Sequence, residues 1–162
     1  MPRIASLLCL ASLGLLASCS AFDMQWLKTP APTAANPSAL MDGKWEGTWQ
    51  SDATDYAGRI QAIAIHTTQA NIDKDAVQQY SATFRMRWFE IPFDEFTVTL
   101  NATLMDDGRI HFEGKKDMGF SKGGIVRFDG YVFPKKDILY CDYANEKDAG
   151  TYKLRRVLSE TE

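Results

Sequence analysis

Two runs of strictly alternating residues constrain the fold of this chain more than any other feature of its sequence. Within residues 80–88 and again within residues 96–104, apolar side chains occupy every second position. Successive side chains of a β-strand point to opposite faces, so each run predicts a strand with one face on a core and the other in water. Arg85 and Arg87 fall on the predicted wet face. With shorter runs of the same kind, the pattern predicts eight strands, over residues 43–51, 58–68, 78–90, 94–105, 109–117, 124–133, 137–143 and 150–157.

The connections between these runs favour antiparallel neighbours. Residues 106–108 (DDG) and 134–137 (PKKD) are compact turn sequences that join adjacent runs. Eight antiparallel strands can close into a barrel, which removes exposed strand edges. We therefore predict an all-β domain over residues 42–158, a small antiparallel up-and-down barrel of about eight strands. The alternative is a two-sheet β-sandwich.

The first expected strand contains two Gly-x-Trp units, with Gly47 between Trp45 and Trp49 on one face, where glycine leaves room for two indoles. This pattern resembles the opening strand of the calycins, the lipocalins and avidins. The resemblance implies a calycin-like barrel in which an arginine of residues 150–156 crosses over the tryptophan. The chain is also similar to uncharacterised bacterial exported barrels, which share its Trp-x-Gly-x-Trp opening, its Gly-Gly pair at residues 123–124 and a closing strand like residues 148–155.

The side chains that the alternation turns inward are sufficient to line an apolar pocket. The alternative is that they simply fill the interior, because an eight-stranded barrel is just wide enough for side chains or one small ligand. The candidate pocket residues are Trp45, Trp49, Phe84, Trp88, Phe96, Tyr131 and Tyr152, and the predicted inward set also includes Ile63, Ile65, Leu100 and Phe112.

Residues 1–18 have the features of a signal peptide. Arg3 precedes an apolar stretch over residues 4–16, which is shorter than the roughly 20 residues of a membrane-spanning helix. Residues 16–19, Leu-Ala-Ser-Cys, resemble the bacterial lipobox. The resemblance implies cleavage before Cys19, acylation of Cys19, and anchoring of the chain to a bacterial membrane through that lipid. By resemblance to Gram-negative lipoproteins, Ser20 then favours the outer membrane, with the protein facing the periplasm.

The cysteine count bears on disulfide formation, and the net charge bears on the class of partner. Cys9 leaves with the leader and Cys19 is expected to be lipidated, so Cys141 is the remaining thiol and the mature chain is predicted to have no internal disulfide. Loss of Arg3 changes the net charge from −3 to −4. A mildly acidic exported chain is a poor candidate for binding nucleic acid, which requires a clustered basic surface.

Residues 19–41 are expected to form a flexible, Pro/Ala-rich tether, and residues 159–162 a C-terminal tail. Three prolines of residues 20–40 favour extended geometry, so this segment could reach roughly 65 Å at about 3.1 Å per residue. The sequence leaves two roles open for the apolar residues near its start, contact with the bilayer surface or docking onto the barrel. These residues are Phe22, Met24, Trp26 and Leu27.

No motif predicts an enzyme, a metal site or a cofactor. His66 and His111 are the only histidines, and no HExxH, GxSxG or CxxC motif accompanies them. Asn71, Asp73 and Asp75 are spaced like the first ligands of an EF-hand loop, but the glycine and glutamate that complete such a loop are missing. A solvated polar loop is therefore favoured there.

The sequence thus predicts a non-enzymatic, lipid-anchored envelope protein whose barrel binds a small apolar molecule or a lipid. The alternative is an interaction module of the envelope, in which a solid barrel serves as the scaffold that contacts another protein.

Overall fold

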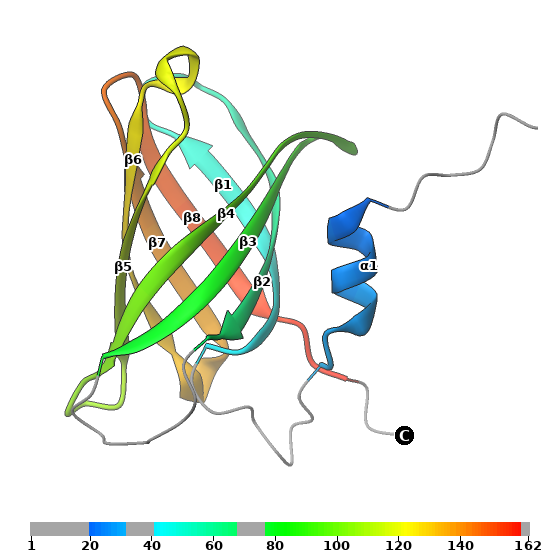
Figure 1. Ribbon diagram of the computed structural model, residues 1–162, viewed down its shortest axis with the longest axis vertical. Helices are drawn as coiled ribbons and strands as arrows, with labels where there is room; N and C mark the ends of the chain where they lie inside the picture. Colours follow the sequence, from blue (N-terminus) through cyan, green and yellow to red (C-terminus); the bar gives the residue numbers. More distant parts are fainter. Residues whose placement is uncertain (1–19, 32–40, 68–76, 160–162) are drawn as a thin grey trace, which may run out of the picture.

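The computed structural model describes residues 20–31, 41–67 and 77–159. Within these residues, eight antiparallel strands form a closed barrel in which each strand pairs with the next and β8 closes against β1 (Figure 1). The prediction of a small up-and-down barrel is confirmed. The strands are β1 (Gly43–Ser51), β2 (Ala57–His66), β3 (Gln78–Trp88), β4 (Ile91–Leu104), β5 (Ile110–Asp117), β6 (Ile125–Phe133), β7 (Ile138–Ala144) and β8 (Ala149–Arg156), with single 3-10 turns at Phe120–Lys122 and Pro134–Lys136.

One end of the barrel is sealed by Trp45, which is fully buried. Its indole Nε1 donates a hydrogen bond to the carbonyl of Met41 at 2.9 Å. The guanidinium of Arg156 lies 4.1 Å from the centre of the indole ring and also donates to Asp137 Oδ1 at 3.1 Å. The expected arginine of the last strand is therefore Arg156, and its predicted position over the tryptophan is confirmed.

Gly47 has a different role from the one that the sequence indicated. It pairs with Leu154 of β8, and a Cβ at this position would overlap the carbonyl oxygen of Lys153. Glycine is required here because the backbones of β1 and β8 approach each other closely, and not because the indoles need the space.

A short helix, α1 (Ala21–Lys28), lies alongside the barrel next to β2 and β3 (Figure 1). Ser20 begins it with a capping box, since its hydroxyl accepts from the backbone of Asp23 and the Asp23 carboxylate accepts from the backbone of Ser20. Phe22 is buried, whereas Met24 and Leu27 are exposed. The prediction of a flexible tether is therefore wrong for α1, and docking onto the barrel is the correct alternative for Phe22.

Arg85 of β3 connects α1 to the barrel wall. It occupies an outward position, yet only 3% of its side chain is exposed. Its guanidinium lies 4.1 Å from the ring centre of Phe22, 2.5 Å from Asp23 Oδ1 and 3.1 Å from Glu95 Oε2, and it also donates to the hydroxyl of Ser20. The prediction of a wet strand face is therefore wrong at Arg85, because α1 covers this part of the wall.

Strand β2 carries apolar side chains on both of its faces. Ile60, Ala62 and Ala64 point into the core, whereas Ile63 lies on the outer face and is nevertheless fully buried. Ile65 follows it on the outer face and is exposed. The predicted inward orientation of Ile63 and Ile65 is wrong, because the pleat turns the alternating alanines inward.

The docking of α1 is expected to depend on pH. Hydrogen bonds from Arg85, and then from Ser20, lower the pKa of Asp23 below its ordinary value of 3.8. A carboxyl group whose pKa is lower in the docked state stabilises that state above the ordinary pKa, and this contribution is lost as pH falls through the lowered value. The indole N–H resonance of Trp26 in an NMR titration should therefore keep its neutral-pH position until the pH falls below about 3.8.

Asp23→Asn is the matched control for this titration. The variant cannot ionise, so its Trp26 resonance should differ from that of the unaltered chain at neutral pH and change little on acidification. Identical titrations of the two proteins would contradict the role assigned to the Asp23 carboxylate.

Candidate functional site

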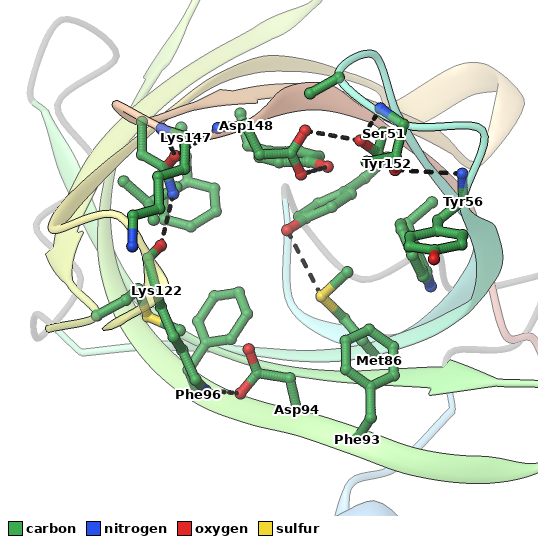
Figure 2. A pocket seen from close by; sticks show the side chains of 18 residues that line it. Ser51, Tyr56, Met86, Phe93, Asp94, Phe96, Lys122, Lys147, Asp148 and Tyr152 are labelled. Atoms are coloured by element: carbon green, nitrogen blue, oxygen red, sulfur yellow. Dashed lines mark hydrogen bonds and ion pairs between the residues drawn. The ribbon is translucent and has the colours of Figure 1, made fainter. Parts of the chain in front are cut away.

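The end of the barrel opposite Trp45 contains a pocket of about 400 Å³. Figure 2 shows its lining side chains, which come from β1, β3, β4, β6, β7 and β8, from the β1–β2 loop, and from the β5–β6 and β7–β8 connections. Small-molecule sites in proteins typically occupy about 300–1,000 Å³. We call this site the mouth pocket; its lining is Trp49, Ser51, Ala53, Thr54, Tyr56, Met86, Phe93, Asp94, Phe96, Met118, Lys122, Val126, Phe128, Tyr143, Asn145, Lys147, Asp148 and Tyr152.

Stacked aromatic rings form one wall of the mouth pocket. The ring centres of Phe96 and Phe128 are 5.7 Å apart, and Tyr143 stacks on Tyr152 at 4.9 Å. Phe84 is buried in the core against this wall, with its ring 5.4 Å from Phe96 and 5.7 Å from Tyr152. The pocket therefore ends on a close-packed aromatic layer rather than continuing through the barrel.

Charged groups of the mouth pocket are held in specific pairs. The carboxylate of Asp148 accepts hydrogen bonds from Ser51 Oγ at 2.7 Å and from Tyr143 Oη at 2.9 Å. Across the mouth, Lys122 Nζ lies 2.6 Å from Asp94 Oδ1 (Figure 2). These contacts provide polar groups beside the apolar lining, which is the usual composition of a small-molecule site.

The two tyrosines of the aromatic wall are held in their neutral form. Burial raises the pKa of Tyr152 well above its ordinary value. Burial also raises the pKa of Tyr143, and the hydrogen bond that it donates to Asp148 raises it further. Tyr152 Oη additionally lies 3.8 Å from the sulfur of Met86. Both phenols therefore remain uncharged hydrogen-bond donors at neutral pH.

The ladder between β4 and β5 is incomplete beside the mouth pocket. In the described strands, the pairing of β4 with β5 runs from Leu100↔Gly114 to Leu104↔Ile110, so the first part of β4 extends beyond this ladder. A second cavity of about 420 Å³ lies at this position, lined by Glu95, Thr97, Lys116 and Asp117 and by Phe96 and Met118, which also line the mouth pocket. The mouth pocket thus adjoins a second cavity, with which it shares Phe96 and Met118.

Three of the predicted pocket residues, Trp49, Phe96 and Tyr152, line the mouth pocket. Two others, Trp45 and Phe84, point inward as expected but belong to the packed core outside it. Leu100 and Phe112, from the wider inward set, are also buried in this core. The interior is thus filled over most of its length and hollow at one end.

The inward prediction is wrong for Trp88 and Tyr131. Trp88 has the inward parity of β3, but it ends the strand at the hairpin, where it is half-exposed and packs on Tyr56 with 5.5 Å between ring centres. Tyr131 lies on the outer face, because Phe128, Gly130 and Val132 are the buried positions of β6. It packs there against His111, with 5.1 Å between ring centres.

Sequence reasoning missed Phe128, although a signal for it was present. It alternates with Gly130, and a Cβ at Gly130 would overlap the carbonyl oxygen of Tyr140 and lie 2.6 Å from Phe112 Cζ. Treating this glycine as an inward position would have assigned Phe128 to the interior. Met86 falls on the same predicted inward face as Phe84, and it lines the mouth pocket. Nothing in the sequence distinguished an inward residue at the open end from one in the core.

The residues considered for catalysis lie apart from the mouth pocket. Cys141 is buried in the core, and burial raises the pKa of its thiol. His66 Nε2 lies 2.6 Å from Gln78 Oε1, and His111 Nε2 lies 3.3 Å from Asp129 Oδ1. Because its pKa is raised, the thiol of Cys141 is a poor nucleophile at neutral pH.

The described ranges contain neither a metal-binding cluster nor a membrane-spanning helix. Among these residues, no three or more His, Cys, Asp or Glu side chains are grouped so that they could hold a metal ion. Helices with the length and apolar character needed to cross a membrane are likewise absent from them. Cys19 and the EF-hand-like residues Asn71, Asp73 and Asp75 lie outside the described residues.

The fold and site together define a class of protein, an antiparallel eight-stranded barrel with one sealed end and one pocket-bearing end. Comparison of the chain with protein-family models, curated proteins and solved structures found no match. The function of the site therefore has to be argued from its own chemistry.

Proposed function

We propose that this protein binds a small apolar molecule or lipid in the mouth pocket. The observation that carries this proposal is a cavity of about 400 Å³ at one end of an otherwise packed barrel. The apolar part of the ligand lies against the aromatic wall formed by Phe96, Phe128 and Tyr152. A polar end of the ligand contacts the groups at the mouth, where Asp94, Lys122 and Asp148 offer charges and hydrogen-bonding atoms.

The same proposal places the protein at a bacterial envelope membrane, anchored through a lipid on Cys19. It is supported by the lipobox-like residues 16–19 after an apolar leader. The diacylglycerol that this motif directs onto the cysteine supplies two acyl chains, and two chains give stable attachment where a single chain binds only marginally. The ligand-binding barrel then works next to a lipid phase, which is a source of apolar molecules.

Filling the mouth pocket should abolish binding without unfolding the barrel. Val126 of β6 lines the pocket, so Val126→Trp would place an indole in the space that the ligand needs. We expect the affinity for the fluorescent apolar probe phenylnaphthylamine to fall at least about tenfold, or about 1.4 kcal/mol. The measurement is a fluorescence titration of the purified chain.

Ile125→Trp is the matched control, because Ile125 precedes Val126 on the same strand and its side chain is exposed. It adds the same indole outside the pocket and should leave probe affinity unchanged. Equal effects of the two substitutions, or saturable binding that persists in Val126→Trp, would contradict binding in the mouth pocket.

A further inference from the structure

The turn between β3 and β4 carries an exposed apolar cluster that the barrel does not use. Trp88, Phe89, Ile91 and Phe93 each leave between 51% and 78% of their surface in solvent. We call these four residues the hairpin tip. The hairpin extends outward at the open end of the barrel (Figure 1). A contiguous exposed cluster of large apolar side chains on a soluble domain marks a contact surface.

The backbone of the hairpin tip favours a small residue where the chain has a large one. Trp88 pairs with Ile91, so Phe89 and Glu90 form a two-residue turn. Phe89 has a φ of 53°, in the left-handed region where glycine or asparagine is the usual choice. A phenylalanine at this position gains nothing from burial, because it is the most exposed residue of the hairpin tip. Burial in the barrel therefore does not account for a phenylalanine at this position.

The start of α1 lies close to the hairpin tip. Ser20 is fixed by the buried guanidinium of Arg85, and Arg85 precedes Trp88 by three residues on β3. At a strand rise of about 3.3 Å per residue, that separation is about 10 Å along the strand. The start of α1 lies toward the same end of the barrel as the hairpin (Figure 1). Cys19 immediately precedes Ser20 in the sequence.

The charges around the hairpin tip suit an anionic lipid surface. Glu90, the acidic residue of the turn, lies 3.5 Å from the guanidinium of Arg59 and 3.7 Å from that of Arg87. These three residues together carry one net positive charge at the turn. Aromatic residues concentrate at the headgroup level of bilayers, and basic residues next to them are attracted to anionic lipids.

We infer that the hairpin tip is a bilayer-contact surface, which enters the same membrane leaflet as the acyl chains on Cys19. The orientation rests on the anchoring proposed above, whereas the contact of the tip with lipid rests on its own exposed residues. Phe93 belongs both to the tip and to the lining of the mouth pocket, where it packs on Trp49 with 5.5 Å between ring centres. The tip therefore connects the lipid phase to the pocket along a continuous apolar surface.

A site-specific label tests this contact in the full-length chain as produced by bacteria. Phe89→Cys carries an environment-sensitive fluorophore, and Lys135→Cys, in the exposed turn at the sealed end, is the matched control. The unaltered chain undergoes the same labelling to measure the background. Each protein is added to vesicles of phosphatidylethanolamine and phosphatidylglycerol, with and without a quencher attached to the lipid chains.

The inference predicts a blue shift and strong quenching for the label at position 89, with neither effect at position 135. Equal responses at the two positions, or no association with the vesicles, would overturn it. The mass of the purified chain reports the anchor separately. An acylated chain whose position 89 is not quenched refutes the contact and keeps the anchor, whereas quenching in a chain without acylation refutes the anchor and keeps the contact.

Discussion

Replacing Trp45 with alanine is expected to lower the free energy of unfolding by about 3–5 kcal/mol. The side chain is fully buried and seals one end of the barrel. Its removal leaves a cavity, deprives the carbonyl of Met41 of its hydrogen-bond donor and exposes the guanidinium of Arg156 to the emptied core. Urea denaturation followed by circular dichroism measures the loss.

Trp88→Ala is the matched control, because it removes the same side chain from a half-exposed position on the hairpin tip. Its effect on unfolding should stay within about 1 kcal/mol, since surface substitutions away from packed sites cost little. Comparable losses in the two variants would show that Trp45 does not have the closing role assigned to it.

Phe84→Ala is expected to combine a similar loss of stability with a deeper pocket. Phe84 lies in the core against Phe96, Phe128 and Tyr152, with ring centres 5.4–6.1 Å away. Truncating a buried phenylalanine typically costs about 3–5 kcal/mol. Because these three neighbours line the mouth pocket, the space left by the ring adjoins it. The variant should therefore bind a longer apolar probe more tightly than the unaltered chain does.

Phe120→Ala is the control for this variant, because Phe120 is 92% exposed. Lys147 Nζ lies over its ring at 5.2 Å. Because the side chain is at the surface, we expect a change in unfolding free energy within about 1 kcal/mol and no change in probe preference. If Phe84→Ala lost stability but kept the probe preference of the unaltered chain, the assigned end of the pocket would be wrong.

Alternation predicted the barrel because it depends only on the local pleat. The runs at residues 80–88 and 96–104 became β3 and β4, and the turn sequences at residues 106–108 and 134–137 join neighbouring strands. Alternation gave a wrong orientation in β2, where apolar residues occupy both faces and no period of two distinguishes inside from outside. Alternation also does not tell that the outward Ile63 is buried whereas the outward Ile65 is exposed.

The start of α1 could have been predicted from the local sequence, whereas the contact of α1 with Arg85 could not. Ser20 and Asp23 have the spacing of a capping box, which predicts a helix start. The burial of Arg85, however, depends on contacts with residues more than sixty positions earlier in the chain. The period of a sequence pattern carries no information about such a distant contact. Arg85 was therefore predicted to be solvated, although it is buried.

The mouth pocket was predictable only in part, because alternation assigns a face and not a height along the barrel. Trp49, Trp45 and Trp88 all have inward parity, yet one lines the pocket, one seals the opposite end and one lies on the hairpin. The pairs Ser51–Asp148 and Asp94–Lys122 join different elements of the fold, so their meeting could not be inferred from sequence spacing.

The most direct test of ligand binding is a crystal structure of the protein grown with a bromine-labelled long-chain alcohol, in which anomalous scattering locates the bromine. We expect the bromine inside the mouth pocket, between Trp49, Phe96 and Tyr152. A structure in which the pocket remains empty, or in which bromine is found only on the outer surface, would contradict the proposed function.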